Sequence, residues 1–151
     1  MLDPHGDLRE LYQEVIFDHN RKPRNFHAME DANHSAEGHN PLCGDQLIVY
    51  AQVQDGIVEK VSFVGQGCAI STASASLMTE AVQGKTLAQV EDLFQGIHAM
   101  LTEAHPEGQD FGKLEVLSGV REFPARVKCA SLAWHTLHNA ITAVDETART
   151  E

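Results

Sequence analysis

The 151-residue sequence has little positive charge and no long apolar run. Lysine and arginine total 11 against 22 aspartates and glutamates, which gives a formal net charge of −11. Nucleic-acid binders carry a basic face, so this balance argues against that class. No stretch approaches the roughly 20 apolar residues of a membrane-spanning helix, and residues 1–7 lack the basic and apolar parts of a signal peptide. We therefore expect a cytoplasmic protein that binds neither membrane nor nucleic acid.

Common catalytic signatures are missing as well. The sequence contains no P-loop, no Rossmann glycine pattern and no G-x-S-x-G elbow. The paired H-x-E and P-C-x-x-C segments of zinc deaminases are also missing. Cysteine is scarce, with Cys43, Cys68 and Cys129 and no C-x-x-C pair. An odd number of cysteines without an export signal argues against a disulfide framework and indicates reduced thiols.

Hydrophobic periodicity predicts an α+β fold, with a small antiparallel sheet packed against several helices. The sequence shows no repeat, linker or low-complexity tract, so we expect a single domain over residues 1–151. Strands are expected near 34–38 and over 46–54 and 57–64, joined by a hairpin turn at Asp55-Gly56. Helices are expected over 7–20, 69–83, 86–103 and 126–147, the third capped by Thr86 with Gln89. An irregular region is expected over 105–121, between the last two of these helices. Four apolar residues in it are expected to reach the core: Phe111, Leu114, Val116 and Leu117.

Each cysteine stands where an element is expected to begin. Cys43 lies in Pro41-Leu42-Cys43-Gly44-Asp45, just before the first clear strand. Cys68 follows a Gly-x-Gly loop at one helix start, and Cys129 lies near the start of the last helix. Amides at a helix N-terminus favour thiolate, so lowered pKa values are expected for these two thiols.

An aspartate completes a set of candidate metal ligands. Asp45 follows Cys43 by two residues, and such positions point to the same side of an extended segment. Three thiolates and one carboxylate supply the four ligands of a tetrahedral zinc site, but they also bring four negative charges. Arg126 and Lys128, which flank Cys129, are the candidates to offset them. The spacing of these residues alone does not decide between a zinc site and three cysteines that are simply small buried residues.

Four ordered segments resemble the iron–sulfur scaffold superfamily that includes IscU and the N-terminal domain of NifU. They are Glu14-Val15-Ile16-Phe17-Asp18-His19 with Pro23-Arg24-Asn25, then Asn40-Pro41-Leu42-Cys43-Gly44-Asp45, then Gly65-Gln66-Gly67-Cys68-Ala69-Ile70-Ser71-x-Ala73-Ser74, and finally Cys129 before a long helix. Lys128 stands where scaffolds of the IscU type have a histidine ligand, and the stretch from Cys68 to Cys129 is longer. Both features are similar to the SufU branch, whose Phe-Pro-Ala-Arg-x-Lys-Cys signature matches residues 123–129.

The resemblance implies a SufU/IscU-like fold and a zinc-dependent sulfur acceptor, or sulfurtransferase. It implies that Cys43, Asp45, Cys68 and Cys129 bind zinc, and that Cys43 accepts persulfide sulfur from a SufS-type cysteine desulfurase. Arg126 would assist the exchange, and downstream Suf assembly machinery would receive the sulfur. Two alternatives stay open. One is a scaffold that assembles a transient iron–sulfur cluster on the same ligands, against which Lys128 argues. The other is a non-catalytic adaptor in which zinc only staples the fold.

Other residues receive less specific interpretations. His135 and His138 are expected at the surface, because the apolar stripe of their helix runs elsewhere. His19 is interpreted as a helix-end residue favoured by the dipole, with a role in partner docking as the alternative. His34 and His39 lie near the first cysteine motif as spare ligand candidates. Trp134 is expected in the core or an interface, and serines 71–76 are expected to allow close helix packing.

Overall fold

A five-stranded sheet forms one layer of the molecule, in the order β4-β3-β2-β1-β5. The computed structural model describes residues 4–41, 43–102, 111–142 and 148–149. In chain order the elements are α1 (Pro4–Arg21), β1 (His34–Asn40), β2 (Asp45–Gln54), β3 (Ile57–Gln66), α2 (Ala69–Val82), β4 (Lys85–Thr86), α3 (Leu87–Thr102), the 3-10 helix η1 (Gly112–Glu122), α4 (Pro124–Thr142) and β5 (Ala148–Arg149). The predicted α+β class is confirmed.

The sheet is antiparallel from β4 to β1, and β5 pairs with β1 in parallel. The β2–β3 hairpin turns at Asp55 and Gly56, whose φ angles are 54° and 75°. Two positive φ angles match the twist of the flanking strands, which is why an Asp-Gly pair favours this turn. The hairpin prediction is therefore confirmed. β4 and β5 were not predicted, because two residues carry no readable alternation.

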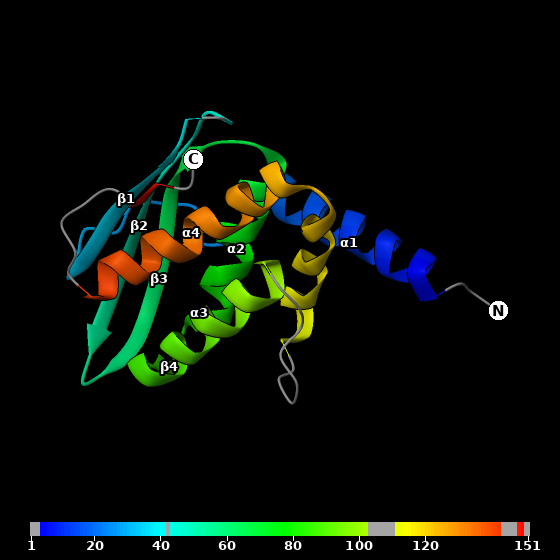
Figure 1. Cartoon of the computed structure of the whole chain (residues 1–151). Coiled ribbons are helices and arrows are strands. Elements are labelled where there is room, and N and C mark those ends of the chain that lie inside the picture. The colour runs from blue at the N-terminus through cyan, green and yellow to red at the C-terminus, as the bar shows by residue number, and fades with distance from the viewer. Residues whose placement is uncertain (1–3, 42, 103–110, 143–147, 150–151) are drawn as a thin grey trace.

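The helices gather on one side of the sheet, as Figure 1 shows. β2 alternates accordingly, with Leu47, Val49 and Ala51 buried. α4 packs on β1 and β2, and α2 lies between α1 and α4. Side chains of α4 fill the space over Gly38, where an added Cβ would lie 2.1 Å from Thr136 Oγ1. A glycine is thus needed for the close approach of β1 to α4.

Small residues of α2 let its two neighbouring helices approach closely. Ser71, Ser74 and Ser76 are buried, and so are the alanines between them. Ser74 Oγ donates to the Ala130 carbonyl at 2.5 Å and accepts from Trp134 Nε1 at 3.2 Å. Trp134 is 2% exposed, so the core prediction for this residue is confirmed. A buried indole N–H requires such an acceptor.

The ends of the later elements follow local chemistry. Thr86 and Gln89 exchange reciprocal hydrogen bonds of 2.9 and 3.1 Å at the start of α3, so the predicted cap is confirmed. The four apolar residues expected to reach the core are buried, Phe111 just before η1 and the other three within it. Residues 105–110 of that region lie outside the described residues. α4 begins at Pro124, two residues earlier than expected, because proline suits the first position of a helix. Its expected extension over 143–147 also lies outside the described residues.

Within the part of the chain that the structure describes, no helix is long and apolar enough to span a membrane.

Candidate metal and thiol site

Three separate segments bring the candidate ligands to one end of the sheet. The first is the β1–β2 connection, with Cys43 in the turn and Asp45 as the first residue of β2; the second is the β3–α2 junction, with Cys68; the third is α4, with Cys129. All three cysteines are free thiols. The Cys129 thiol donates to Cys43 Sγ at 3.0 Å. One ligand atom each from Cys43, Asp45 and Cys129 lie within 4.8 Å of one another, and this group could hold a metal ion. The turn is tight because Gly44 has a φ of 71°, a value that glycine adopts readily.

Cys68 adjoins this group from the β3–α2 junction. It caps the N-terminus of α2, where its Sγ accepts from the Ser71 N–H at 3.4 Å. Its own N–H donates to Asp45 Oδ1 at 2.8 Å. An added Cβ on Gly67 would lie 2.5 Å from Asp45 Oδ1, so this glycine leaves room for the carboxylate. The tight group contains three of the four predicted ligands, and Cys68 borders it.

Asp45 carries the observation that favours a cation. The residue is fully buried, and Oδ1 is occupied by the Cys68 N–H. Oδ2 is also buried, yet it has no hydrogen-bond partner among the described residues. A buried carboxylate oxygen without a partner is costly, and it is rarely left so without a functional reason. The donor set of thiols and one carboxylate fits zinc, whose usual ligands include both.

The Cys129 thiol differs from the sequence-based expectation. Burial, with hydrogen bonding to Cys43 next, raises the pKa of Cys129 well above its ordinary value. The expected lowering is wrong for this residue because it is the sixth residue of α4, inside the helix rather than at its N-terminus. There the Ala125 carbonyl, 3.5 Å from Cys129 Sγ, is an alternative acceptor for the single S–H. Thiolate at this position therefore needs a positive charge nearby, which a bound cation supplies.

Arg126 is the basic side chain that faces the thiols. The charge of the Cys68 thiolate is the largest cause that raises the pKa of the Arg126 guanidinium, and Cys129 and Cys43 add to it. The side chain is exposed. It could therefore meet an anionic group that approaches from solvent as well as the thiols.

The spare ligand candidates lie outside the group of close ligand atoms. The Nδ1 atom of His34 lies 3.1 Å from the Ala140 carbonyl, near the opposite end of α4 from Cys129. His39 is half-buried beside Asn40. A residue without an expected role lies closer: Asn40 is fully buried, and its Nδ2 donates to Cys129 Sγ at 3.8 Å. The position of Asn40 in the motif of the first cysteine is the one sequence signal for a role at this site. Nothing in the sequence indicates its contact with Cys129, 89 residues away.

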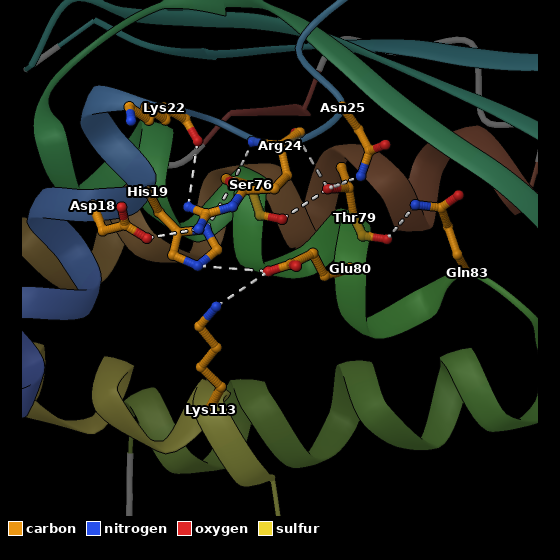
Figure 2. A network of polar contacts seen from close by, with 10 residues as sticks. All are labelled: Asp18, His19, Lys22, Arg24, Asn25, Ser76, Thr79, Glu80, Gln83 and Lys113. Atoms are coloured by element: carbon orange, nitrogen blue, oxygen red, sulfur yellow. Dashed lines mark hydrogen bonds and ion pairs between the residues drawn. The ribbon is translucent and has the colours of Figure 1, made fainter.

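His19 lies in the last turn of α1, as expected for a helix-end residue, but it is buried and its ring is neutral, so the expected stabilisation of a charged ring by the helix dipole is wrong. Its ring is 0% exposed, and Nδ1 lies 2.7 Å from Ser76 Oγ (Figure 2). Nε2 lies 3.5 Å from Glu80 Oε1, which also pairs with Lys113. Burial, followed by the charges of Lys113 and Arg24, lowers the pKa of His19 to about 4. The residue is a neutral part of the α1–α2 interface.

The expected surface position of His135 and His138 is also wrong. Both are half-buried between α3 and α4, where the ring of Phe94 stacks on His138 with centroids 4.5 Å apart. His135 packs edge-on against Phe94 at 5.3 Å and against His98 at 5.6 Å. Burial is the main cause that lowers the pKa of His135. The apolar partner comes from another helix, so the pattern of α4 alone did not reveal it.

Known proteins share both the sequence and this architecture. The family model described as NifU-like N terminal domain matches residues 11–149. The zinc-dependent sulfurtransferase SufU of Bacillus subtilis (strain 168) is 38% identical over 139 residues, covering 90% of this chain and 92% of the relative. The iron–sulfur cluster assembly scaffold protein IscU of Thermotoga maritima is 39% identical over 140 residues, covering 91% and 96%.

A solved structure gives the same result in three dimensions. It is described as a putative iron–sulfur cluster assembly scaffold protein for the SUF system, from Fervidobacterium islandicum AW-1. It matches with a TM-score of 0.82 at 31% identity, covering 88% of this chain and 98% of the other. The chain therefore belongs to the NifU-like N-terminal domain family of iron–sulfur cluster assembly proteins, together with relatives named SufU and IscU.

Proposed function

We propose that this protein is a zinc-dependent sulfur acceptor that takes persulfide sulfur from a SufS-type cysteine desulfurase and passes it to downstream Suf assembly machinery. The observation that carries the proposal is the close group of Cys43, Asp45 and Cys129, in which the buried Asp45 Oδ2 has no hydrogen-bond partner among the described residues. The similarity to a relative named zinc-dependent sulfurtransferase supports the choice of metal and reaction.

Cys43, Asp45, Cys68 and Cys129 are the residues that would hold the metal. Zinc is redox-inactive, and when bound it would keep the thiolates deprotonated and protected from oxidation. Cys68 and Asp45 are held by backbone N–H groups, and Cys129 is buried inside α4. Cys43 lies on a turn and is partly exposed. It is therefore the thiol best placed to leave the site and accept sulfur.

The transfer itself is an ordinary thiol exchange. The Cys43 thiolate attacks the terminal sulfur of the enzyme-bound persulfide and forms a new S–S bond. The S–S bond of the desulfurase persulfide breaks, and its cysteine leaves as a thiolate. The reaction begins with a persulfide on the desulfurase and a thiolate on Cys43, and it ends with a persulfide on Cys43 and a thiolate on the desulfurase. No external oxidant or reductant is therefore needed. Arg126, which faces the thiols from solvent, would stabilise the anionic groups during the exchange.

A combined metal and turnover measurement tests the proposal. Metal content is determined on protein purified without added metal, and desulfurase turnover is measured with and without the chain. We expect one zinc per chain, stimulated turnover, and at least a tenfold loss of stimulation in Cys43→Ser. His39→Gln is the matched control, since His39 lies beside the same motif but outside the ligand group. Normal sulfur loading of Cys43→Ser would overturn the assignment of the acceptor.

The alternative with support of its own is an iron–sulfur scaffold. The IscU relative carries that description in its name, and soft thiolates bind iron clusters as well as zinc. Iron with labile sulfide in the purified protein would favour this function over sulfur transfer. Bound zinc without any effect on turnover of the cognate desulfurase would instead indicate an adaptor that zinc only staples.

A further inference from the structure

Asn40 is buried beside the site and contacts two of the proposed ligand residues, Cys43 and Cys129. It is the last residue of β1, it is fully buried, and it pairs with Asp45 across the β1–β2 register. Its side-chain Nδ2 donates to Cys129 Sγ at 3.8 Å, which lies within hydrogen-bond range for sulfur. Its backbone carbonyl accepts the N–H of Cys43 at 3.3 Å. One residue thus contacts a thiol in α4 and the turn that carries another.

The donors around the ligands are distributed unequally. Cys68 Sγ accepts from the Ser71 N–H, and Asp45 Oδ1 accepts from the Cys68 N–H. Both donors belong to the backbone. Cys129 Sγ is different, because its N–H donor is a side-chain amide that a single substitution removes. Among the described residues, the hydrogen bond that Cys43 Sγ accepts comes from the Cys129 thiol, whose proton is lost when Cys129 binds a metal.

We propose that Asn40 is a positioning residue whose amide holds the Cys129 thiolate in the ligand set, so that exchange is confined to Cys43. The inference rests on the proposed function, because it concerns which thiolate stays when the other leaves. An N–H donor stabilises a thiolate buried among other anions, and outer-shell donors of this kind orient ligands and tune metal affinity. Asn40 touches a ligand rather than the incoming sulfur.

The geometry separates this role from simple closure of the turn. The bond that closes the turn uses the Asn40 backbone carbonyl, which every substitution retains. Side-chain variants therefore remove the amide donor and leave the bond to the Cys43 N–H in place. Asn40→Ala shortens the side chain, whereas Asn40→Leu keeps its branched shape without a donor. Both are used, so that a folding defect in one leaves the other to decide.

Zinc affinity and the site of thiol reaction are the readouts. Each variant competes for Zn²⁺ with a chromophoric chelator, and iodoacetamide adducts on the zinc-loaded protein are located by mass spectrometry. We expect Asn40→Leu and Asn40→Ala to bind zinc 10- to 100-fold more weakly. We also expect the variants to be alkylated at both Cys129 and Cys43, and the parent protein to be alkylated at Cys43 alone. The control is Thr136→Val, which removes a buried 2.7 Å hydrogen bond of the same helix without touching a thiol.

The outcomes distinguish the two levels of inference. If folded Asn40 variants bind zinc within twofold of the parent and react at Cys43 alone, the role of Asn40 is overturned. An equal loss of zinc affinity in Thr136→Val also overturns it, since general destabilisation then explains the effect. If the parent protein itself binds no zinc, the proposed function is overturned and the role of Asn40 with it, whereas the two preceding results overturn the role of Asn40 alone.

Discussion

At the scale of single residues, Asp45 combines a proposed ligand position with an unfavourable buried environment. One carboxylate oxygen accepts the Cys68 N–H, and the other is buried without a hydrogen-bond partner among the described residues. Such an atom lowers the stability of the metal-free protein, because it has lost its water without gaining a partner. The same atom is free to bind a cation. Stability without metal and affinity for metal are therefore expected to oppose each other at this residue.

Asp45→Asn separates these two contributions. The amide keeps the shape and an oxygen for the Cys68 N–H, and it removes the buried negative charge. We expect the metal-free variant to be more stable to urea by about 1 kcal/mol, and its zinc affinity to fall at least tenfold. Asp31→Asn, at an exposed carboxylate, is the control for charge alone. A less stable metal-free variant with unchanged zinc affinity would show that Asp45 mainly anchors the start of α2.

The sequence identifies the site residues better than it identifies their environment. The motif around Cys43 indicates that Asp45 lies beside it, because only Gly44 separates the two residues, and the structure brings both next to Cys129. The pKa direction expected for Cys129 is wrong, because α4 starts at Pro124 and the thiol lies deeper in the helix than expected. The contact of Asn40 with Cys129 depends on how β1 docks on α4. No local pattern encodes that docking.

At the scale of elements, a polar network joins α1 to α2, and Figure 2 shows its members. Ser76 Oγ contacts His19 Nδ1 at 2.7 Å and accepts the Arg24 N–H at 2.8 Å. Asn25 Nδ2 donates to Thr79 Oγ1 at 2.9 Å one turn further along α2. The periodicity of its apolar residues predicts α1, but it does not predict that α1 bonds to α2. Ser76 lies 57 residues beyond His19, and the local hydrophobic pattern does not identify such a distant hydrogen-bond partner.

Acid should loosen this interface through His19. Burial, then Lys113 and Arg24, lowers its pKa to about 4, while Glu80 and Asp18 oppose the shift. A depressed histidine pKa means that the fold favours the neutral ring. The stability contribution is therefore complete above the unfolded pKa of about 6.5 and is lost as the pH falls toward 4. The linkage relation gives a loss of about 2 kcal/mol between pH 7.5 and pH 5.

Urea unfolding of metal-free protein at the two pH values measures this loss. His19→Gln is expected to be less stable at pH 7.5 and to lose about 2 kcal/mol less than the parent on acidification. His135 shifts in the same direction, so His135→Gln is compared in parallel to separate the two histidines. An unchanged pH dependence in His19→Gln would assign the acid sensitivity to the α3–α4 cluster instead.

Local signals explain which elements the sequence reveals. The Asp55-Gly56 turn and the Thr86–Gln89 cap are formed by neighbouring residues, and both are confirmed. β4 and β5 have two residues each, and pairing with a distant strand is what defines them. The same holds for His135, whose burial depends on Phe94 of another helix. The periodicity of one segment predicts that element, but it does not predict which other elements the segment contacts.

At the scale of the whole molecule, the hydrophobic core includes Cys129 and contacts Cys43 and Cys68, but it extends far beyond these proposed ligands. Its largest fully buried side chains include Trp134, Leu77 and Met78, in α4 and α2. The proposed ligands lie at one end of the sheet, on two loops, the first residue of β2 and one helix. Most of the buried apolar side chains belong to residues other than the proposed ligands, unlike in small zinc domains, which unfold when the metal is removed. Zinc should therefore stabilise the fold without being required for it.

Chelation of the zinc-loaded protein tests that distinction. Zinc at about 1,000 times its dissociation constant adds about 4 kcal/mol of stability, which corresponds to roughly 10 °C in Tm for a chain of this length. After chelation we expect the far-ultraviolet circular dichroism to stay unchanged and Tm to fall by about that amount. Added zinc should restore Tm in the parent but not in Cys129→Ser. Complete unfolding on chelation would instead assign zinc to holding the fold together, because a metal that must remain bound to all of its ligands cannot release Cys43 for sulfur transfer.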